Sequence, residues 1–368
     1  MAKFDDIFID CTSQGTKIPK DKYLITGKNI VIDQGQNVIA GYTNLEDGLF
    51  EDVPAIIFGD HTRIIKYVDH PFFLGADGVK LLKSKRKDAN YKYLYYALKN
   101  AKIPDTGYNR HFKWLKEIEI EYPNAERQAD IVKVLDNISS IITNRKAELE
   151  ELEKLIKARF VELFGDPIIN SEDLPTMPMT EVCEIIDGDR GKNYPTAEEF
   201  SDDGYCLFLN AKNVTASGFN FDNCMFVSKE KDEALRKGKL SRGDVVLTTR
   251  GTLGNLAFYT NEVPFENVRI NSGMVILRMK QDIVDEVYFI EQFKLQLDDI
   301  KEKIASGSAQ PQLPISTMNK IQVLVPDIDR QREFADFTKQ VDKSKVAVQK
   351  SLDETQLLFN SLMQKYFG

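Results

Sequence analysis

The sequence lacks any apolar run of the roughly 18 residues that a membrane-spanning helix needs. Its first residues, Met-Ala-Lys-Phe-Asp-Asp, are charged and carry no apolar stretch of the kind that forms a secretory signal. The four cysteines, Cys11, Cys183, Cys206 and Cys224, include no C-x-x-C pair, which is typical of free thiols in a reducing compartment. These absences predict a cytoplasmic protein, and three histidines without metal-ligand spacing predict no metal site.

Motifs of the common catalytic centres are also absent from the sequence. There is no G-x-x-x-x-G-K-[ST] phosphate loop, no dinucleotide-binding glycine fingerprint, no G-x-S-x-G elbow and no H-E-x-x-H. The dense run of glutamates at 148–153 has the spacing of the solvated side of a helix. The sequence therefore favours a binding protein over an enzyme, with no cofactor in this chain.

Charge is spread unevenly along the chain. The net charge of −8 argues against a protein that coats nucleic acid indiscriminately. Residues 80–116 nevertheless hold eleven basic and two acidic side chains. This segment predicts a local basic surface on a mildly acidic protein.

The chain contains an internal repeat, because residues 123–165 align without a gap on residues 326–368 at an offset of 203. The identical positions lie toward both ends of this block. They are Pro123, Arg127, Gln128, Leu149, Glu151, Leu155, Phe164 and Gly165, which recur as Pro326, Arg330, Gln331, Leu352, Glu354, Leu358, Phe367 and Gly368.

Each copy of this block predicts one long helix. Apolar residues recur every three or four positions, and no Gly or Pro occurs between Ala125 and Phe164, so a helix of roughly 60 Å is allowed. Arg145 and Arg159 interrupt the first apolar stripe, and Thr338, Lys345 and Thr355 weaken the second. Neither helix would bury its stripe alone, so we expect the two to pack together. The stripe residues are Ile131, Leu135, Ile138, Ile142, Leu149, Leu152 and Ile156 in the first helix, and Val341, Val348, Leu352 and Phe359 in the second.

The segments before the two helices also correspond, at an offset of 195. Gly78-Val-Lys-Leu-Leu matches Gly273-Met-Val-Ile-Leu, and Tyr93-Leu-Tyr-Tyr matches Tyr288-Phe-Ile-Glu, each as a strand followed by a helix. Alternating apolar residues from Leu115 to Ile120, and from Met318 to Val325, predict a last strand before each long helix. The change of offset from 195 to 203 places eight extra residues in the second copy. The predicted parts are domains 1–122 and 166–325 and helices 123–165 and 326–368.

Two groups of residues in the first domain could contact nucleic acid. Lys83, Lys85, Arg86 and Lys87 are predicted to lie in a turn between strand and helix, where they could reach phosphates. A solvated loop explains this turn equally well. Asn109, Arg110 and His111 carry the donors and acceptors that base edges require.

In the second domain, residues 242–254 read as a buried strand that runs into a glycine loop. Thr249, Arg250 and Thr252 could present hydroxyl and guanidinium groups from this strand end. Gln310 and Gln312, in a small polar loop, are suited to base or backbone contact. A simple turn remains the alternative for each of these stretches.

Several of these stretches resemble the target-recognition domains of type I restriction–modification specificity subunits. They read Leu-Phe-Leu-Asn-Ala-Lys-Asn-Val at 207–214, Gly-Asp-Val-Val-Leu-Thr-Thr-Arg-Gly-Thr-Leu-Gly at 243–254 and Ser-Gly-Ser-Ala-Gln-Pro-Gln-Leu at 306–313. The Pro-x-x-[Glu/Asp]-Arg-Gln entry into each long helix resembles the same family. The resemblance covers essentially the whole chain and adds Lys212, in the first stretch, to the candidate DNA contacts.

The resemblance implies an α+β fold with two mixed α/β target-recognition domains and two long helices that form an antiparallel coiled coil with pseudo-two-fold symmetry. Each domain would read one half of a bipartite, asymmetric DNA target, and the coiled coil would set the spacer. The chain would be a non-catalytic subunit that docks two modification subunits. These would carry S-adenosylmethionine and methylate adenine, and an ATP-using restriction subunit could join for cleavage.

The first domain departs from the family pattern, because it offers Val53-Pro-Ala-Ile-Ile-Phe-Gly-Asp60 where the second domain has its glycine loop. Two other functions remain open at this point. The chain could be a coiled-coil assembly adaptor whose globular domains bind protein, or a self-contained enzyme that acts on DNA.

Overall fold

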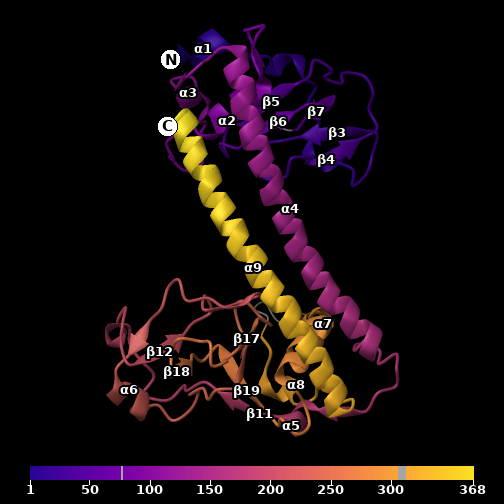
Figure 1. Cartoon of the computed structure of the whole chain (residues 1–368), viewed down its shortest axis with the longest axis vertical. Helices are drawn as coiled ribbons and strands as arrows, with labels where there is room; N and C mark the ends of the chain where they lie inside the picture. The colour runs from indigo at the N-terminus through magenta and orange to yellow at the C-terminus, as the bar shows by residue number, and fades with distance from the viewer. Residues whose placement is uncertain (76–77, 306–311) are drawn as a thin grey trace. The chain divides into compact units, whose positions relative to one another are not determined.

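The computed structural model describes residues 1–75, 78–305 and 312–368, which divide into two compact units (Figure 1). Unit 1 comprises Met1–Ala147 and Gln349–Gly368, and unit 2 comprises Glu148–Val348. Each unit therefore combines one globular domain with a part of both long helices. Among the helices of the described residues, none is long and apolar enough to cross a membrane.

Unit 1 contains a four-stranded sheet of order β2-β8-β5-β6, a three-stranded sheet of order β4-β3-β7 and the pair β1-β9. Its strands are β1 (Ala2–Lys3), β2 (Phe8–Asp10), β3 (Asn29–Ile32), β4 (Gly41–Thr43), β5 (Ala55–Gly59), β6 (Ile65–Val68), β7 (Phe72–Leu74), β8 (Val79–Ser84) and β9 (Glu119–Ile120). Its short helices are α1 (Phe4–Ile7), η1 (Thr12–Gln14), η2 (Lys20–Lys22), α2 (Tyr91–Lys99) and α3 (Phe112–Leu115).

Unit 2 contains sheets of order β11-β19-β16-β17 and β15-β12-β18, and the pairs β10-β20 and β13-β14. Its strands are β10 (Thr176–Pro178), β11 (Cys183–Asp187), β12 (Cys206–Leu209), β13 (Val214–Thr215), β14 (Gly218–Phe219), β15 (Phe226–Val227), β16 (Val245–Thr248), β17 (Leu256–Phe258), β18 (Val268–Ile270), β19 (Met274–Met279) and β20 (Gln322–Leu324). Its helices besides the long ones are α5 (Met179–Val182), η3 (Ala197–Glu199), α6 (Lys229–Ala234), α7 (Glu286–Ala305) and α8 (Ile315–Met318).

The two units repeat one topology. The order β2-β8-β5-β6 corresponds strand by strand to β11-β19-β16-β17, and β4-β3-β7 corresponds to β15-β12-β18. In each three-stranded sheet the central strand is antiparallel to one neighbour and parallel to the other. The predicted α+β class with an internal repeat is confirmed.

The two long helices are α4 (Ala125–Phe164) and α9 (Ile328–Phe367). Within unit 2 they run antiparallel. The Lys345 ammonium pairs with Glu153, and Arg330 Nη2 donates to the carbonyl oxygen of Leu163 at 2.7 Å, so residue numbers fall along α9 as they rise along α4. The long paired helices predicted from the apolar periodicity are present in the structure.

The apolar stripes of the two helices are buried or half-buried at every position named from the sequence. In unit 1, Leu135 and Phe359 belong to one core cluster with the globular domain, and in unit 2 Ile156 and Val341 do the same. Thr338 does not interrupt the stripe, because its side chain is only 1% exposed. Packing against the globular domains therefore also buries a polar position within the apolar periodicity of the helix.

The last strand before each long helix is shorter in the structure than the sequence predicted. Leu115 ends α3, and only Glu119–Ile120 pairs with β1. Phe112 and Leu115 lie three residues apart on one face of this helical turn and both are buried, so a helix buries them as well as a strand would. In unit 2 Met318 likewise ends α8, and the strand that follows is β20.

The segment with the eight extra residues of the second copy includes a longer helix. Helix α7 has 20 residues, whereas its counterpart α2 has nine.

Candidate nucleic-acid interface

In unit 2, four strands end at the same edge of the domain. Strand β12 lies parallel to β18, so Leu209 pairs with Ile270, while Thr248 and Asp187 end β16 and β11 beside the start of β19. We call the residues that join there the loop edge of unit 2. These residues are 188–193, 210–213, 235–238, 249–255, 271–273 and Gln312.

The predicted Thr249, Arg250 and Gln312 meet at this loop edge. Arg250 is exposed, and its backbone forms an isolated antiparallel bridge with Gln312, which is also exposed. Thr249 is buried, and its amide and its hydroxyl both donate to the carbonyl oxygen of Gly273, at 2.8 and 3.0 Å. Thr249 therefore fixes the loop, whereas Arg250 and Gln312 are available to a ligand.

Two further residues predicted for this domain, Thr252 and Lys212, are also exposed at the loop edge. Thr252 is exposed in the turn after Arg250, and its carbonyl oxygen accepts a hydrogen bond from Thr248. Lys212 is exposed in the turn after β12, two residues before Val214, whose carbonyl oxygen accepts from Asn255 Nδ2 at 2.9 Å. Gln310 lies outside the described residues.

Arg190 and Arg236 are both exposed at the loop edge and were not predicted from the sequence. Arg190 is half-exposed and donates from Nη2 to the carbonyl oxygen of Ser272 at 3.2 Å. Asp189 accepts hydrogen bonds from the backbone amides of Gly191 at 2.7 Å and of Arg236 at 2.8 Å, and these bonds lower the pKa of its carboxyl group. The sequence signal was the turn Asp-Gly-Asp-Arg-Gly at 187–191, which could have been read as a loop that presents an arginine.

Glycine is required where three of these loops meet. A Cβ on Gly188 would lie 2.3 Å from the carbonyl oxygen of Asn271, and one on Gly238 would lie 3.2 Å from the Cα of Gly188. Gly238 also adopts a φ of +83°, which favours glycine. The backbones of three loops can therefore approach closely, and their side chains share one surface.

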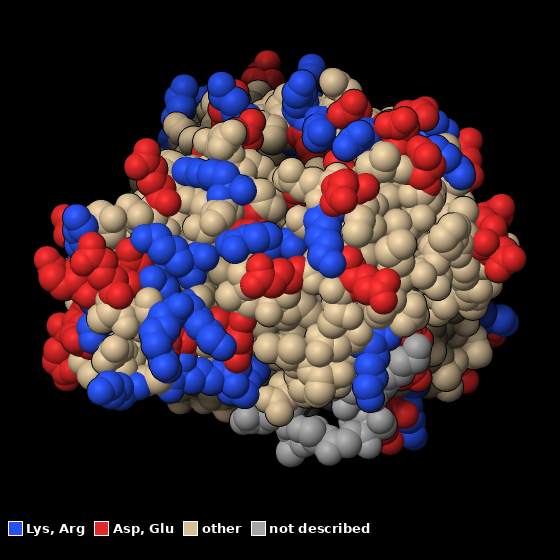
Figure 2. All heavy atoms as spheres, turned by 90° about the horizontal axis from the view of Figure 1, so that it is seen from below, with Lys and Arg blue, Asp and Glu red and all other residues tan. Residues whose placement is uncertain are grey.

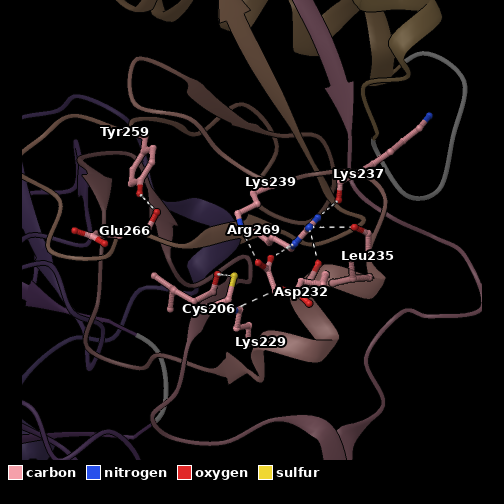
Figure 3. A network of polar contacts seen from close by, with 11 residues as sticks. Cys206, Lys229, Asp232, Leu235, Lys237, Lys239, Tyr259, Glu266 and Arg269 are labelled. Carbon is pink, nitrogen blue, oxygen red and sulfur yellow. Dashed lines mark hydrogen bonds and ion pairs between the residues drawn. The ribbon is translucent and has the colours of Figure 1, made fainter.

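A buried ionic network holds the segment that carries Arg236 and Lys237 (Figure 3). Arg269, on β18, pairs with Asp232 and donates from Nη1 to the carbonyl oxygen of Lys237 at 2.7 Å, while Lys239 forms a second ion pair with Asp232. Burial raises the pKa of Asp232, but hydrogen bonds from the two cations outweigh it and hold the pKa below its ordinary value. Figure 3 shows the side chain of Lys237 extending away from this network.

Positive charge gathers on the part of unit 2 that lies at the bottom of Figure 1. Figure 2 looks onto this face and shows a group of Lys and Arg side chains lying together, with Asp and Glu side chains along the left margin. A grouped positive field of this kind attracts a polyanion even when the protein as a whole is acidic.

Unit 1 has an equivalent loop edge, formed by residues 33–37, 60–64 and 100–111 together with Gly75 and Gly78. The Asp60 amide donates to the carbonyl oxygen of Gly78 at 2.7 Å, and the His111 amide donates to the carbonyl oxygen of Asp60 at 2.8 Å. In unit 2 the same two bonds run from Thr249 to Gly273 and from Leu313 to Thr249. Asp60 and Thr249 are therefore equivalent positions.

The structure separates the three residues predicted in residues 109–111. Asn109 and Arg110 are exposed at the loop edge. His111 is fully buried, with Nδ1 3.0 Å from the carbonyl oxygen of Asp60 and Nε2 3.4 Å from Thr106 Oγ1. Its ring therefore supports the loop and does not reach the surface, contrary to the expectation of a base contact.

The predicted basic turn lies at the other end of β8. Lys83 belongs to the strand and not to the turn, and its ammonium donates to the carbonyl oxygens of Asp52 and Pro54 at 2.7 and 2.9 Å. Lys85, Arg86 and Lys87 follow Ser84 and are exposed, whereas the loop edge begins beside Val79. The basic turn and the loop edge of unit 1 are therefore separate sites.

Two of the three exposed cations in this turn make contacts within the domain. Lys85 Nζ donates to the carbonyl oxygen of Asp5, and the Arg86 guanidinium lies 5.6 Å from the centre of the Tyr122 ring. Both contacts leave the charge at the surface, where it can reach phosphate.

A family model described as the type I restriction modification DNA specificity domain matches residues 3–154 and 171–355. A putative type I specificity subunit from Mycoplasma genitalium is 24% identical over 337 residues, which cover 86% of this chain and 81% of the relative. The EcoR124I/EcoR124II specificity subunit of Escherichia coli is 29% identical over 153 residues, 36% of this chain, and the match spans only 38% of that relative's length.

Solved structures show the same fold. The crystal structure of the type I restriction–modification S subunit from M. genitalium superposes with a TM-score of 0.62 at 20% identity, covering 100% of this chain and 95% of that chain. A chain from a structure titled as the basis of complex assembly and conformational transition of the type I system gives 0.55 at 15% identity, covering 100% and 95%. The chain, with two matched specificity domains and two long helices, belongs to the specificity-subunit family of type I restriction–modification systems.

Proposed function

We propose that this chain reads a bipartite, asymmetric target in double-stranded DNA, one half with each domain. The observation that carries the proposal is the pair of equivalent loop edges. Asp60 and Thr249 occupy the same place in the repeated topology, yet the exposed residues beside them differ, with Asn109 and Arg110 in unit 1 and Arg250 and Gln312 in unit 2. Equivalent scaffolds with unlike polar side chains suit two different base sequences.

The base-contacting residues in this proposal are exposed side chains of the loop edges, and the basic turn contacts phosphate. Arginine and glutamine can each form paired hydrogen bonds with a purine edge, and exposed lysines add salt-dependent affinity. The proposed contacts are Asn109 and Arg110 in unit 1, Lys212, Arg250, Thr252 and Gln312 in unit 2, and Lys85, Arg86 and Lys87 in the turn after β8.

We further propose that the paired helices set the spacer between the half-sites and dock two modification subunits. Leu155 and Leu358 are equivalent in the repeat, and both are exposed, by 46% and 51%, although they belong to amphipathic helices. Identical exposed leucines at equivalent positions suit two copies of one partner. In this proposal the modification subunits bind S-adenosylmethionine and methylate adenine, an ATP-using restriction subunit can join, and this chain supplies no catalytic group.

Fluorescence anisotropy of the purified chain with a random-sequence duplex, titrated over salt, tests the proposal. Phosphate contacts release counterions, so the logarithm of the binding constant should fall linearly with the logarithm of the salt concentration. An affinity that does not change with salt would contradict DNA binding and would favour a coiled-coil adaptor that binds protein.

A further inference from the structure

An aromatic pair stands at the loop edge of unit 1, in residues that the DNA contacts named above do not include. The rings of His61 and Tyr108 are stacked, with centroids 4.6 Å apart and planes inclined by 9°. His61 follows β5, and Tyr108 lies between α2 and α3. Tyr108 is 86% exposed although the imidazole covers one face of its ring.

The two loops that carry this pair are tied together by several hydrogen bonds. The His61 amide donates to Gln34 Oε1 at 3.1 Å, and His61 Nδ1 lies 3.2 Å from the carbonyl oxygen of Asn109. Arg63 pairs with Asp105 at 2.7 Å, which joins the loop after β5 to the loop before α3. The stack is therefore held by its surroundings and does not depend on ring contact alone.

The backbone of these two loops includes two residues with positive φ. Arg63 adopts a φ of +62°, which is unfavourable for a residue other than glycine. Its amide donates to the carbonyl oxygen of Gly59 at 2.7 Å, which closes the turn that contains His61. Gly107 has a φ of +74°, and nothing lies within 4 Å of the place where its Cβ would be, so the chain beside Tyr108 projects into open space. Two loops that are joined by an ion pair, a hydrogen bond and a ring stack hold the exposed ring in one place, which pre-organises it for a partner.

The position of the pair in the fold corresponds to the proposed DNA-contact loops of unit 2. His61 follows Asp60 as Arg250 follows Thr249, and Arg110 precedes His111 as Gln312 precedes Leu313. Unit 2 joins its two exposed residues by the Arg250–Gln312 bridge, and unit 1 joins the same two loops by the His61–Tyr108 stack. His61 therefore occupies the place of Arg250, and Tyr108 lies in the same loop as the counterpart of Gln312, which is Arg110.

We propose that the His61–Tyr108 stack is a specificity-determining contact of unit 1, in which the exposed ring of Tyr108 packs against a base edge in one half of the DNA target. Aromatic and methyl groups can pack against the thymine methyl in the major groove, and a tyrosine ring buries a large area with little loss of side-chain freedom. The imidazole holds the ring in place. This inference rests on the proposed reading of a bipartite target.

Selection of bound sequences from a random duplex pool, using the full-length chain, tests the inference. The wild type should enrich a target with two defined halves. Tyr108→Ala should reduce discrimination at one or two base pairs of one half by about tenfold, the range of a single good base contact, and leave the other half unchanged. Arg250→Ala should do the reverse. Tyr108→Phe keeps the ring and should retain most of the preference.

Ile25→Ala provides a matched control, because Ile25 is a 94% exposed apolar residue of the same unit that lies outside the loop edge. Circular dichroism and thermal melting of each variant establish that the fold is kept. Unchanged preference in Tyr108→Ala, or a change in the same half as Arg250→Ala, would overturn the inference while the proposed function stands. If the wild type enriches no sequence, the proposed function fails and the inference fails with it.

Discussion

The side-chain oxygen of Gln128 accepts a hydrogen bond from the backbone amide of Asn90 at 2.9 Å, and this joins the first turn of α4 to the start of α2. Gln128 Nε2 donates to the carbonyl oxygen of Pro123 at 2.8 Å. Gln331 makes the same two bonds in unit 2, with Asp285 at 3.0 Å and Pro326 at 2.8 Å. Both glutamines are fully buried, so the repeated Pro-x-x-[Glu/Asp]-Arg-Gln motif has a structural role at the base of each long helix.

Replacement of Gln128 by leucine should destabilise unit 1 by about 2 kcal/mol, because it removes the partner of the half-buried Asn90 amide and of the half-buried Pro123 carbonyl. The only tryptophan of the chain, Trp114, lies in unit 1, so its fluorescence during urea denaturation reports this unit. Gln364→Ala, at an exposed position of α9 in the same unit, should change the transition little. Equal midpoints for the two variants would contradict the role of Gln128.

The periodicity of the sequence predicted both long helices closely, because the burial of a helical stripe depends on residues three and four positions apart. The same reasoning failed between Leu115 and Ile120. There a short apolar segment suited a helical turn as well as a strand, and the turn formed beside Asp60, whose carboxylate accepts the amide of Phe112 at 2.8 Å. The partner that decided the outcome lies 52 residues away in the sequence.

The candidate site was predicted only in part, for a related reason. Composition identified the basic residues after β8. It could not show that the Lys83 ammonium donates its hydrogen bonds to the carbonyl oxygens of Asp52 and Pro54. The His61–Tyr108 stack and the contact of Asp189 with Arg236 each join loops more than 40 residues apart. Strand order brings these loops together, and strand order is a property of the whole domain.

Asp232→Asn should lower the free energy of local opening of the segment 229–240 by about 3 kcal/mol, because it leaves the buried Arg269 guanidinium without its carboxylate. Hydrogen–deuterium exchange over this segment measures the loss. Glu233→Gln, on the same helix but exposed, is the matched control.

The Asp232 network also predicts a dependence on pH. Its carboxyl pKa is held below the ordinary value of roughly 4, so the stabilisation is fully present above that value and is lost as the pH falls through the lowered pKa. Protection of the 229–240 segment of the wild type, corrected for the intrinsic exchange rate at each pH, should therefore fall as the pH drops below about 4. The Asp232→Asn variant should show a flatter dependence, and an equally steep fall in the variant would contradict this assignment.

Charge reversal at the loop edge of unit 1 and in the basic turn after β8 should have different effects on DNA binding. Arg110→Glu, at the loop edge, should lower affinity about tenfold and alter the preferred sequence, because it removes a proposed base contact. Lys87→Glu, in the basic turn, should weaken all sequences alike and reduce the salt slope by about one. Anisotropy with the selected target and with a scrambled duplex separates these results. An unaltered sequence preference in Arg110→Glu, or an unaltered salt slope in Lys87→Glu, would contradict the respective assignment.

Leu155→Asp and Leu358→Asp should each prevent binding of one modification subunit and leave binding of the other intact. A charge in the centre of an apolar contact typically costs several kcal/mol of binding energy. Mass measurement of complexes reconstituted with the proposed modification subunit should give two copies of it for the wild type, one for each single variant and none for the double variant. Lys157→Asp, an exposed change on α4 two residues from Leu155, is the control. Full occupancy in the double variant would show that these leucines take no part.

Removal of one heptad from each long helix should shorten the tolerated spacer in the DNA target. The segments 143–149 and 346–352 are equivalent at the offset of 203, so their joint deletion keeps the two helices alike in length and in apolar phase. Seven residues correspond to about 10 Å of helix, and therefore to about three base pairs. Methylation sequencing of cells that express the chain with its partner measures the spacer. Replacing the same segments by other heptads of equal length should leave the spacer unchanged, and an unchanged spacer after the deletion would contradict the role of the helices as its ruler.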